Sequence, residues 1–243
     1  MATRAASPVR LYLGQPLAEG QTVRLSRDHA NYLFNVMRLG VGARLHLFDG
    51  ATGEYAAEVV EAGKRAGALL IGARVRPVQM PPDLWLLFAP IKKARTDFIV
   101  EKAAEMGAAR ILPVQTDHTN AERVRRDRLQ AHAVEAAEQC GGTFVPEVGD
   151  LAPLSTVLAD WPTGRHLMFC DEELAGARTT FDGPAGAWAI LIGPEGGFSD
   201  SERRRLADMP LAHPVSLGPR ILRADTAAVA ALTLWQARLG DWR

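Results

Sequence analysis

Apolar and polar positions alternate in short runs through the first 76 residues, and this period predicts β-strands. Ser26 suits the N-cap of one helix that interrupts the strands. The apolar positions of that helix recur at the spacing of a single face, at Ala30, Leu33, Phe34 and Met37. Turns rich in glycine and proline separate the strand runs, which cover residues 9–13, 22–25, 43–48, 55–60 and 68–75. Short strands at such intervals predict a small β-barrel over residues 1–76.

After a proline-rich junction at residues 77–82, strands and helices alternate, and this order predicts an α/β domain with a mostly parallel sheet over residues 77–243. Strands are expected at residues 84–88, 111–114, 166–170, 188–192 and 212–216. Helices are expected at residues 96–106, 129–140 and 225–239, with Thr96 as an N-cap. One more helix should begin at a capping box formed by Ser199 and Glu202.

The 243 residues carry no net formal charge, but the charge is unevenly distributed. Residues 1–76 hold 10 Lys and Arg against 6 Asp and Glu, and residues 77–243 hold 18 against 22. The basic first part is compatible with a polyanionic partner, although so small an excess also fits chance. Only two cysteines occur, residues 1–10 have no apolar signal region, and no apolar run approaches membrane-spanning length. We therefore expect a cytoplasmic protein without a membrane partner.

The sequence LIGPEGGFS at residues 191–199 places a glycine-rich loop between a buried strand and a capped helix. Ligands bind beyond the carboxyl ends of strands in open α/β sheets, and glycine lets the backbone approach them closely. A tight turn without a ligand is the alternative, but it needs fewer glycines. The loop matches neither the P-loop nor the dinucleotide fingerprint.

A second loop, LGPRILRADT at residues 217–226, also follows a strand and precedes a helix. Arg220 and Arg223 are cations at a helix N-terminus, where positive charge is unfavourable. An anion nearby would compensate, and Asp225, Glu195 and a substrate phosphate are the candidates. A solvated helix start is the alternative interpretation.

Other basic positions are less specific. Lys92, Lys93 and Arg95 precede a predicted helix and suit either a phosphate backbone or solvent. The basic run at residues 123–128 is equally ambiguous, and residues 203–205 are expected on a solvated helix face. Histidines and cysteines lack metal-ligand spacing, and no nucleophile elbow is present, so metal and acyl-transfer chemistry are not expected.

Five ordered blocks resemble the RsmE family of 16S rRNA uridine N3-methyltransferases, which belong to the SPOUT superfamily. The blocks are HANYLFNVMRL with LFDG (residues 29–39 and 47–50), VEKAAEMG (100–107), EAAEQCG with VPEV (135–141 and 145–148), IGPEGGF (192–198) and LGPRILRADT (217–226). The chain departs from the family pattern after Gly141, where Gly142, Thr143 and Phe144 replace a basic stretch. It departs again at Glu101, where glutamine is common, and at Asp225, where glutamate is usual.

The resemblance implies a PUA-like β-barrel followed by an α/β trefoil-knot (SPOUT) domain, a homodimer, and S-adenosyl-L-methionine as cofactor without a metal. The implied reaction is methylation of N3 of U1498 in 16S rRNA of the small ribosomal subunit. The implied cofactor-binding residues are Ile192, Gly193, Pro194, Glu195, Gly196, Gly197, Leu217, Gly218, Ile221 and Leu222. Arg220 and Arg223 are expected to be catalytic. RNA contacts are expected from Arg10, Arg38, Lys92, Lys93 and Arg95.

Two other functions remain open from the sequence. One is a SPOUT enzyme that methylates a ribose 2′-hydroxyl or another base. The other is an RNA-binding or ribosome-assembly protein whose knot does not catalyse. Glu195 and Asp225 are the candidates for a general base, and the sequence does not separate Arg220 from Arg223 as the residue that contacts the target base.

Overall fold

A computed structural model describes residues 8–121, 123–177 and 181–243, so most of the segment 1–10 lies outside the described residues. Internal contacts divide the chain into two units. The N-terminal unit comprises Met1–Met80 and Glu138–Phe144, and the C-terminal unit comprises Pro81–Ala137 and Val145–Arg243. Among the described helices, none is long and apolar enough to cross a membrane.

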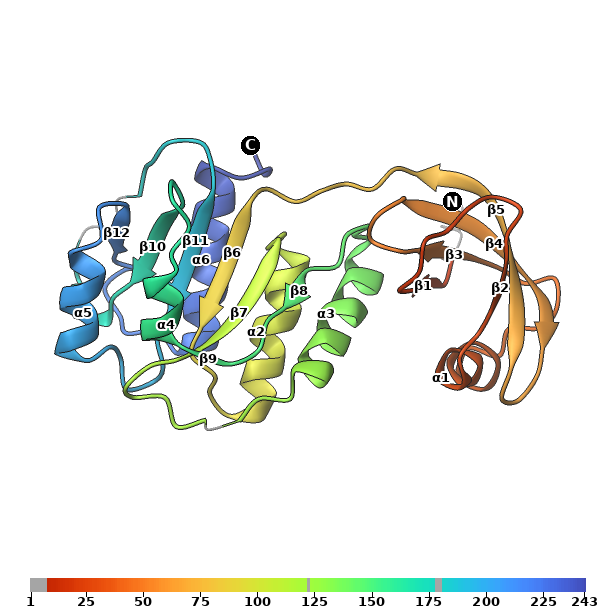
Figure 1. Cartoon of the computed structure of the whole chain (residues 1–243), viewed down its shortest axis with the longest axis horizontal. Coiled ribbons are helices and arrows are strands. Elements are labelled where there is room, and N and C mark those ends of the chain that lie inside the picture. The colour runs from red at the N-terminus through yellow and green to blue at the C-terminus, as the bar shows by residue number, and fades with distance from the viewer. Residues whose placement is uncertain (1–7, 122, 178–180) are drawn as a thin grey trace, which may run out of the picture. The chain divides into compact units, whose positions relative to one another are not determined.

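The N-terminal unit is a five-stranded sheet with one helical segment (Figure 1). Its strands have the order β1-β3-β4-β5-β2, in which only β1 and β3 are parallel. They span Arg10–Tyr12 (β1), Thr22–Arg24 (β2), Arg44–Phe48 (β3), Glu54–Ala62 (β4) and Gly67–Arg76 (β5). Apolar side chains from all five strands and the helix meet in one core, because alternate residues of a strand face the same side. The five strands predicted from the sequence are therefore confirmed.

The helical segment begins as α1 (Arg27–Ala30), and Ser26 caps it by accepting a hydrogen bond from the His29 backbone amide (3.1 Å). It continues as a π-helix over Asn31–Val36, with a bond from the Met37 amide to the Tyr32 carbonyl (2.9 Å). The wider turn shifts the residues that follow around the axis. Met37, predicted on the buried face, is consequently 40% exposed.

A buried carboxylate organises one end of this unit. Glu54 is fully buried and binds Arg10 (3.0 Å), Arg76 and His46 (2.9 Å). Arg10 also donates to the carbonyls of Glu138 (2.7 Å) and Gly142 (2.6 Å). These bonds attach the segment Glu138–Phe144 to the N-terminal unit.

Glu54→Gln should destabilise the N-terminal unit by about 2 kcal/mol at pH 7, because it leaves two arginines beside a neutral amide. Burial raises the pKa of Glu54, but hydrogen bonds from Arg10 and Arg76 outweigh burial and hold it below its usual 4.5. A lowered pKa adds stability above pH 4.5 that is lost as pH falls through the folded-state pKa. Hydrogen exchange of the β3 and β4 amides, measured from pH 7 to 3, checks this.

The matched control for that substitution is Glu58→Gln, an exposed position on the same strand. It should leave both the stability and the acid profile close to wild type. Equal protection in the Glu54 and Glu58 variants across the pH range would show that Glu54 contributes nothing to this unit.

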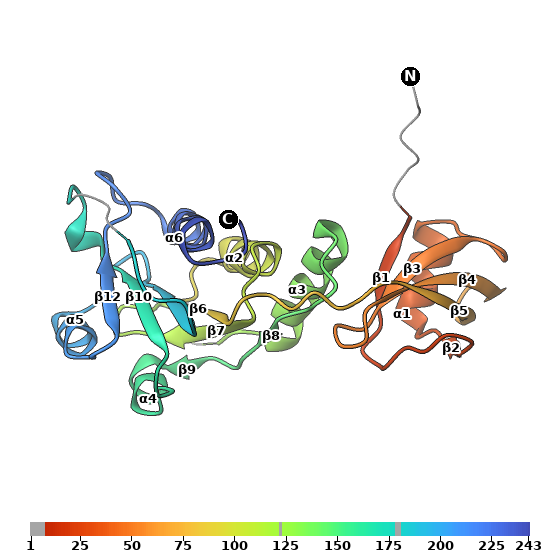
Figure 2. The ribbon, with the colours of Figure 1, turned by 90° about the horizontal axis from the view of Figure 1, so that it is seen from above.

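The C-terminal unit has three layers (Figures 1 and 2). Its central sheet is parallel and has the order β12-β10-β11-β6-β7-β8, and β9 pairs with β7. The strands are Leu84–Phe88 (β6), Arg110–Gln115 (β7), Glu147–Val148 (β8), Ala152–Pro153 (β9), His166–Cys170 (β10), Trp188–Ile192 (β11) and Ala212–Val215 (β12). Helices α2 (Lys93–Glu105), α3 (Arg126–Cys140) and α6 (Ala224–Arg238) lie on one face, and α4 (Leu154–Ala159) and α5 (Asp200–Ala207) on the other.

The sheet is buried on both faces, as the continuous apolar runs predict. Leu86 and Ile190 face α2, α3 and α6, whereas Leu87 and Leu191 face α4 and α5. Trp235 and neighbouring residues of α6 are buried in the first of these cores, so much of that helix's apolar face is covered within the monomer.

The predicted helix starts are wrong at two places. Helix α2 begins at Lys93, and the Thr96 hydroxyl lies inside the helix, where it accepts from the Ile91 amide (3.0 Å) and donates to the Ile91 carbonyl (3.1 Å). Thr96 therefore closes the preceding loop and is not the N-cap. Helix α3 begins at Arg126, before the predicted start at residue 129. Its first turn was missed because it is polar and has no apolar period to mark it.

Candidate active site

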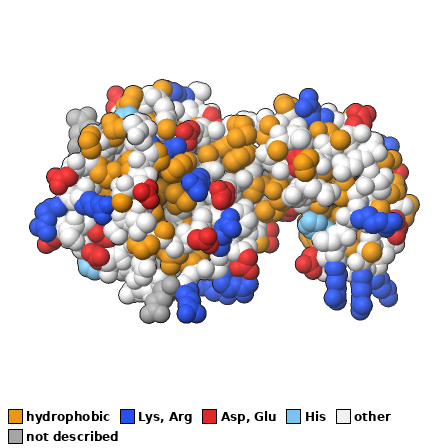
Figure 3. Space-filling model, in the orientation of Figure 1, with side chains coloured by type: hydrophobic (Ala, Val, Ile, Leu, Met, Phe, Trp, Pro, Cys, Tyr) orange, Lys and Arg blue, Asp and Glu red, His pale blue; other side chains and the backbone are white. Residues whose placement is uncertain are grey.

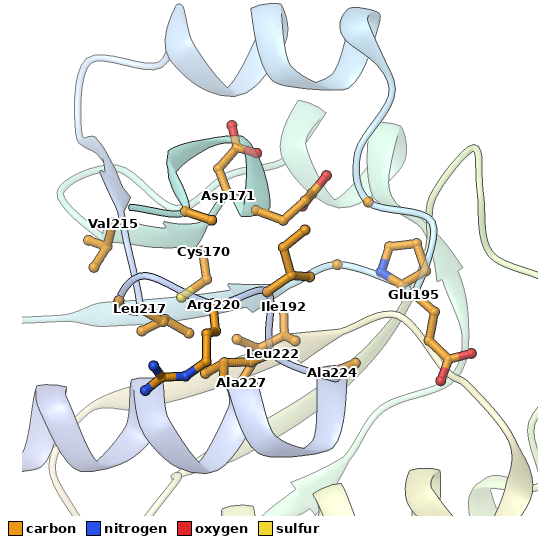
Figure 4. Close-up of a pocket in the computed structure, with 17 residues that line it drawn as sticks. Cys170, Asp171, Ile192, Glu195, Val215, Leu217, Arg220, Leu222, Ala224 and Ala227 are labelled. Atoms are coloured by element: carbon orange, nitrogen blue, oxygen red, sulfur yellow. The ribbon is translucent and has the colours of Figure 1, made fainter. Parts of the chain in front are cut away.

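Three loops enclose a pocket at the carboxyl ends of β10, β11 and β12 (Figure 4). Parallel strands bring these ends to one edge of the sheet, where α/β folds bind ligands. The pocket spans about 580 Å³, including space open to solvent. It is lined by Cys170, Asp171, Glu172, Ala175, Ile192, Gly193, Pro194, Glu195, Gly197, Val215, Leu217, Gly218, Arg220, Ile221, Leu222, Ala224 and Ala227.

The glycine loop, residues 193–198, forms one wall. Phe198 is buried and anchors the loop, and a Cβ on Gly193 would lie 3.1 Å from its ring. Gly197 has φ +70°, a conformation that favours glycine. Five of the six cofactor residues predicted here line the pocket; the sixth, Gly196, instead accepts a hydrogen bond from His118 Nδ1 (3.0 Å). The Ser199–Glu202 capping box that begins α5 is confirmed.

The arginine loop, residues 217–223, forms the second wall. Leu217, Gly218, Ile221 and Leu222, which were predicted to bind the cofactor, line the pocket, and Ile221 is 75% exposed at its rim. The structure separates the two arginines. Arg220 lines the pocket, whereas Arg223 is the exposed N-cap residue of α6 and does not.

The third wall follows β10 and was not predicted from the sequence. Cys170 and Asp171 lead into a short 3-10 helix at Glu172–Leu174, and these residues face the other two loops. Burial raises the pKa of the Cys170 thiol to about 12, so this thiol stays protonated and packs as an apolar group. An acidic run directly after a buried strand was the only available signal in the sequence.

Arg203 was expected in solvent, and this prediction is wrong. Its side chain is 18% exposed and binds Asp171 (3.2 Å), Glu172 and Glu173 (3.0 Å). Burial lowers the pKa of Arg203, but the hydrogen bond to Asp171 and the surrounding carboxylates outweigh burial and raise it. The Arg203 guanidinium thus fixes the third wall of the pocket, which is called the acidic wall because it contains Asp171 and Glu172.

Arg203→Met should weaken ligand binding in this pocket about 10-fold, because the acidic wall loses its counter-charge and its carboxylates repel one another. Calorimetric titration with S-adenosylmethionine measures the effect. Arg204→Met is the control, since Arg204 lies next in α5 but is exposed. Equal affinities in the two variants would contradict a positioning role for Arg203.

The remaining predicted residues have different surroundings. Arg95 binds Glu195 (2.6 Å) and approaches Asp225 (3.6 Å), so it joins the glycine loop to the first turn of α6. Lys92 and Lys93 are exposed beside it. Arg10 binds Glu54 and backbone carbonyls, and its side chain is only 11% exposed, so little of it is accessible to RNA.

Arg38 is exposed and has φ +57°, which is rare for a residue other than glycine. The basic run at residues 123–128 is used partly within the fold, where Arg126 donates to the Val148 carbonyl (2.7 Å) and Arg128 binds Asp97. The described residues contain no cluster of side chains suited to a metal ion.

The chain matches two family models. One, described as an RNA methyltransferase domain, covers residues 78–236, and the other, an RNA methyltransferase PUA domain, covers residues 25–71. Ribosomal RNA small subunit methyltransferase E of Mycobacterium bovis is 31% identical over 251 residues, with 91% of each chain covered. This chain belongs to the ribosomal RNA small subunit methyltransferase E family.

Other proteins of that name are also similar to this chain over nearly its whole length. The Rickettsia conorii protein of that name is 29% identical over 235 residues, with 95% of each chain covered. The crystal structure of the Neisseria gonorrhoeae protein, bound to S-adenosyl methionine, has a TM-score of 0.87 at 28% identity and covers 98% of this chain and 100% of that one. The resemblance found in the sequence is confirmed, and with it the fold class: a PUA-like domain precedes a SPOUT α/β-knot methyltransferase domain.

Proposed function

We propose that this protein transfers a methyl group from S-adenosyl-L-methionine to N3 of U1498 in 16S rRNA. The observation that carries the proposal is the pocket formed by the glycine loop, the arginine loop and the acidic wall, in a chain of this family. The domains that we assign are an RNA-binding domain at residues 1–76 and a cofactor-binding domain at residues 77–243.

The pocket suits the cofactor chemically. No atom lies within 4 Å of the place where a Cβ on Gly218 would stand, so a nucleoside can approach the backbone closely there. Asp171 and Glu172 place negative charge beside a ligand that carries sulfonium and ammonium groups. When bound, the cofactor supplies an electrophilic methyl group. No metal is required for this chemistry.

The residues around the pocket then act on the uracil. N3 of uridine carries a proton at neutral pH, and its loss places negative charge on the ring and its carbonyl oxygens. Arg220 or Arg223 stabilises that charge, which is larger in the transition state than in the ground state. Glu195 and Asp225 are the candidate bases, and Arg95 holds both carboxylates at the same edge of the sheet.

The N-terminal unit offers a basic surface for RNA. A groove beside α1 is lined by Arg27, Asp28, Asn31, Asn35, Lys64 and Arg65. Figure 3 shows lysine and arginine side chains gathered at this end of the unit. We assign phosphate contacts to this groove and to Arg38, and further contacts to Lys92, Lys93 and Arg95 in the C-terminal unit.

We also propose that the enzyme works in the cytoplasm as a homodimer. Val229 and Leu234 of α6 are only partly buried within one chain, so they remain available to a second copy. The small ribosomal subunit or its RNA is the proposed macromolecular partner.

One experiment tests the function directly. The protein is incubated with labelled S-adenosylmethionine and small subunits that lack the modification, and the labelled nucleotide is mapped. Label on N3 of U1498 is the expected result. Label on a ribose or on another base would instead identify a different SPOUT specificity. Absence of label, with RNA binding retained, would identify a binding protein.

A further inference from the structure

A second pocket adjoins the first at the glycine loop. It is lined by residues 90–92, by His118, Asn120 and Ala121, and by Pro194 and Glu195. These segments follow β6, β7 and β11, so the second pocket opens at the same edge of the sheet as the cofactor pocket. Lys92 and Glu195 already have proposed roles, but no ligand has yet been assigned to the cavity that they line.

The two pockets share Pro194 and Glu195. Figure 4 shows that the Glu195 carboxylate lies on the side of its loop away from Cys170 and Leu217. Arg95 fixes the carboxylate there through the 2.6 Å ion pair. His118 Nδ1 lies 3.0 Å from the Gly196 carbonyl and 3.2 Å from the Gly197 carbonyl, and this fixes the wall between the pockets. A ligand in the second pocket would therefore lie next to a ligand in the first.

The second pocket has apolar side chains that suit the face of a pyrimidine ring and polar side chains that suit its hydrogen-bonding edge. Pro90, Ile91, Ala121 and Pro194 supply apolar surface for a planar ring. Lys92 and Asn120 supply donors, and within the described part of the chain neither side chain has a hydrogen-bond partner. Glu195 supplies an acceptor. Uracil presents two carbonyl acceptors around the N3 donor, and these three side chains provide the complementary set of two donors and one acceptor.

We propose that the second pocket, called the base pocket from here on, receives the target uracil after that base has left its stack in the RNA. The inference rests on the proposed function and deepens it, since it names the groups that select the base. Cytosine would present an unprotonated N3 to the Glu195 carboxylate, and two acceptors would then meet. The pocket thus favours uracil over cytosine. Extrusion of the base is required because N3 is paired or stacked inside folded RNA.

Two variants test the base pocket without altering the cofactor pocket. Ala121→Trp fills it, and Asn120→Asp keeps its shape but replaces an amide donor with a charged acceptor. Each should keep the dissociation constant for S-adenosylmethionine within about 2-fold of wild type, while kcat/KM for methylation of small subunits falls at least about 10-fold. Ala131→Trp, on the exposed face of α3, is the control and should behave like wild type.

A crosslink gives a second measurement that needs no turnover. Small-subunit RNA carrying 4-thiouridine at the nucleotide that wild-type enzyme methylates is irradiated with the protein, and the attached peptide is sequenced. Attachment within residues 90–92 or 118–121 is expected. Attachment elsewhere, or normal methylation by Ala121→Trp, would overturn the proposal. Loss of S-adenosylmethionine affinity in both variants would also overturn it, because the pocket would then belong to the cofactor.

The proposed function can fail separately from this inference. If wild-type protein binds S-adenosylmethionine but methylates another base, the proposed target is wrong, and the crosslink at that base still decides whether the pocket holds it.

Discussion

Gly197→Ala is expected to weaken S-adenosylmethionine binding about 100-fold, which corresponds to about 2.7 kcal/mol. Gly197 has φ +70°, where a side chain costs about 1–2 kcal/mol. A Cβ at this position would also overlap Glu172 Oε1. Glu172 cannot swing aside freely, because Arg203 holds its carboxylate. The added Cβ would therefore either displace the Glu172 carboxylate from Arg203 or separate the glycine loop from the acidic wall, and either change alters the pocket between them.

Gly164→Ala separates the two causes of that loss. Gly164 has φ +81°, so alanine meets the same backbone strain, but no atom lies within 4 Å of the added Cβ. Both variants should lose thermal stability, Gly197→Ala at least as much as Gly164→Ala, whereas only Gly197→Ala should lose cofactor affinity. Calorimetric titration and thermal unfolding measure the two effects. Unchanged affinity in Gly197→Ala would remove the acidic wall from the cofactor site.

The sequence predicted well those features that depend on local pattern. The buried strands β6, β10 and β11 were located to the residue, because each is a compact apolar run bounded by turn signals. The capping box at Ser199 and Glu202 was found because its two partners are three residues apart. Both pocket loops were identified for the same reason, since each contains its glycines and its strand-to-helix context within ten residues.

Features that depend on distant partners were missed. Arg203 has the sequence context of a solvated helix residue, and only the fold brings it to Asp171 and Glu172, which follow another strand. Arg10 was assigned to RNA because no local signal reveals that it meets Glu54. The order of strands in the parallel sheet, and hence which loops adjoin, likewise has no period in the sequence. Family resemblance supplied the knot, which residue chemistry alone does not predict.

Arg223 is exposed at the start of α6, and its substitution is expected to reduce the rate of methyl transfer strongly. Arg223→Ala should lower the rate of methyl transfer to RNA about 100- to 1000-fold, the range seen when one donor to a developing anion is removed. Affinity for S-adenosylmethionine should stay within about 2-fold of wild type, because Arg223 does not line the cofactor pocket. Arg223 precedes Asp225 by two residues in the sequence. Arg95 contacts both Asp225 and Glu195, and Glu195 lines the proposed base pocket.

Arg220→Ala is the informative comparison, since Arg220 lines the pocket and its loss should reduce cofactor affinity as well as transfer. Arg238→Ala, at the exposed far end of α6, serves as the control. Single-turnover methylation of small subunits, run with saturating S-adenosylmethionine, separates chemistry from cofactor binding. Normal single-turnover transfer in Arg223→Ala together with lost transfer in Arg220→Ala would reassign the anion-stabilising role to Arg220. Arg223 lines neither pocket, so the comparison of Arg223→Ala with Arg220→Ala decides which arginine of this loop meets the charge that develops on the uracil.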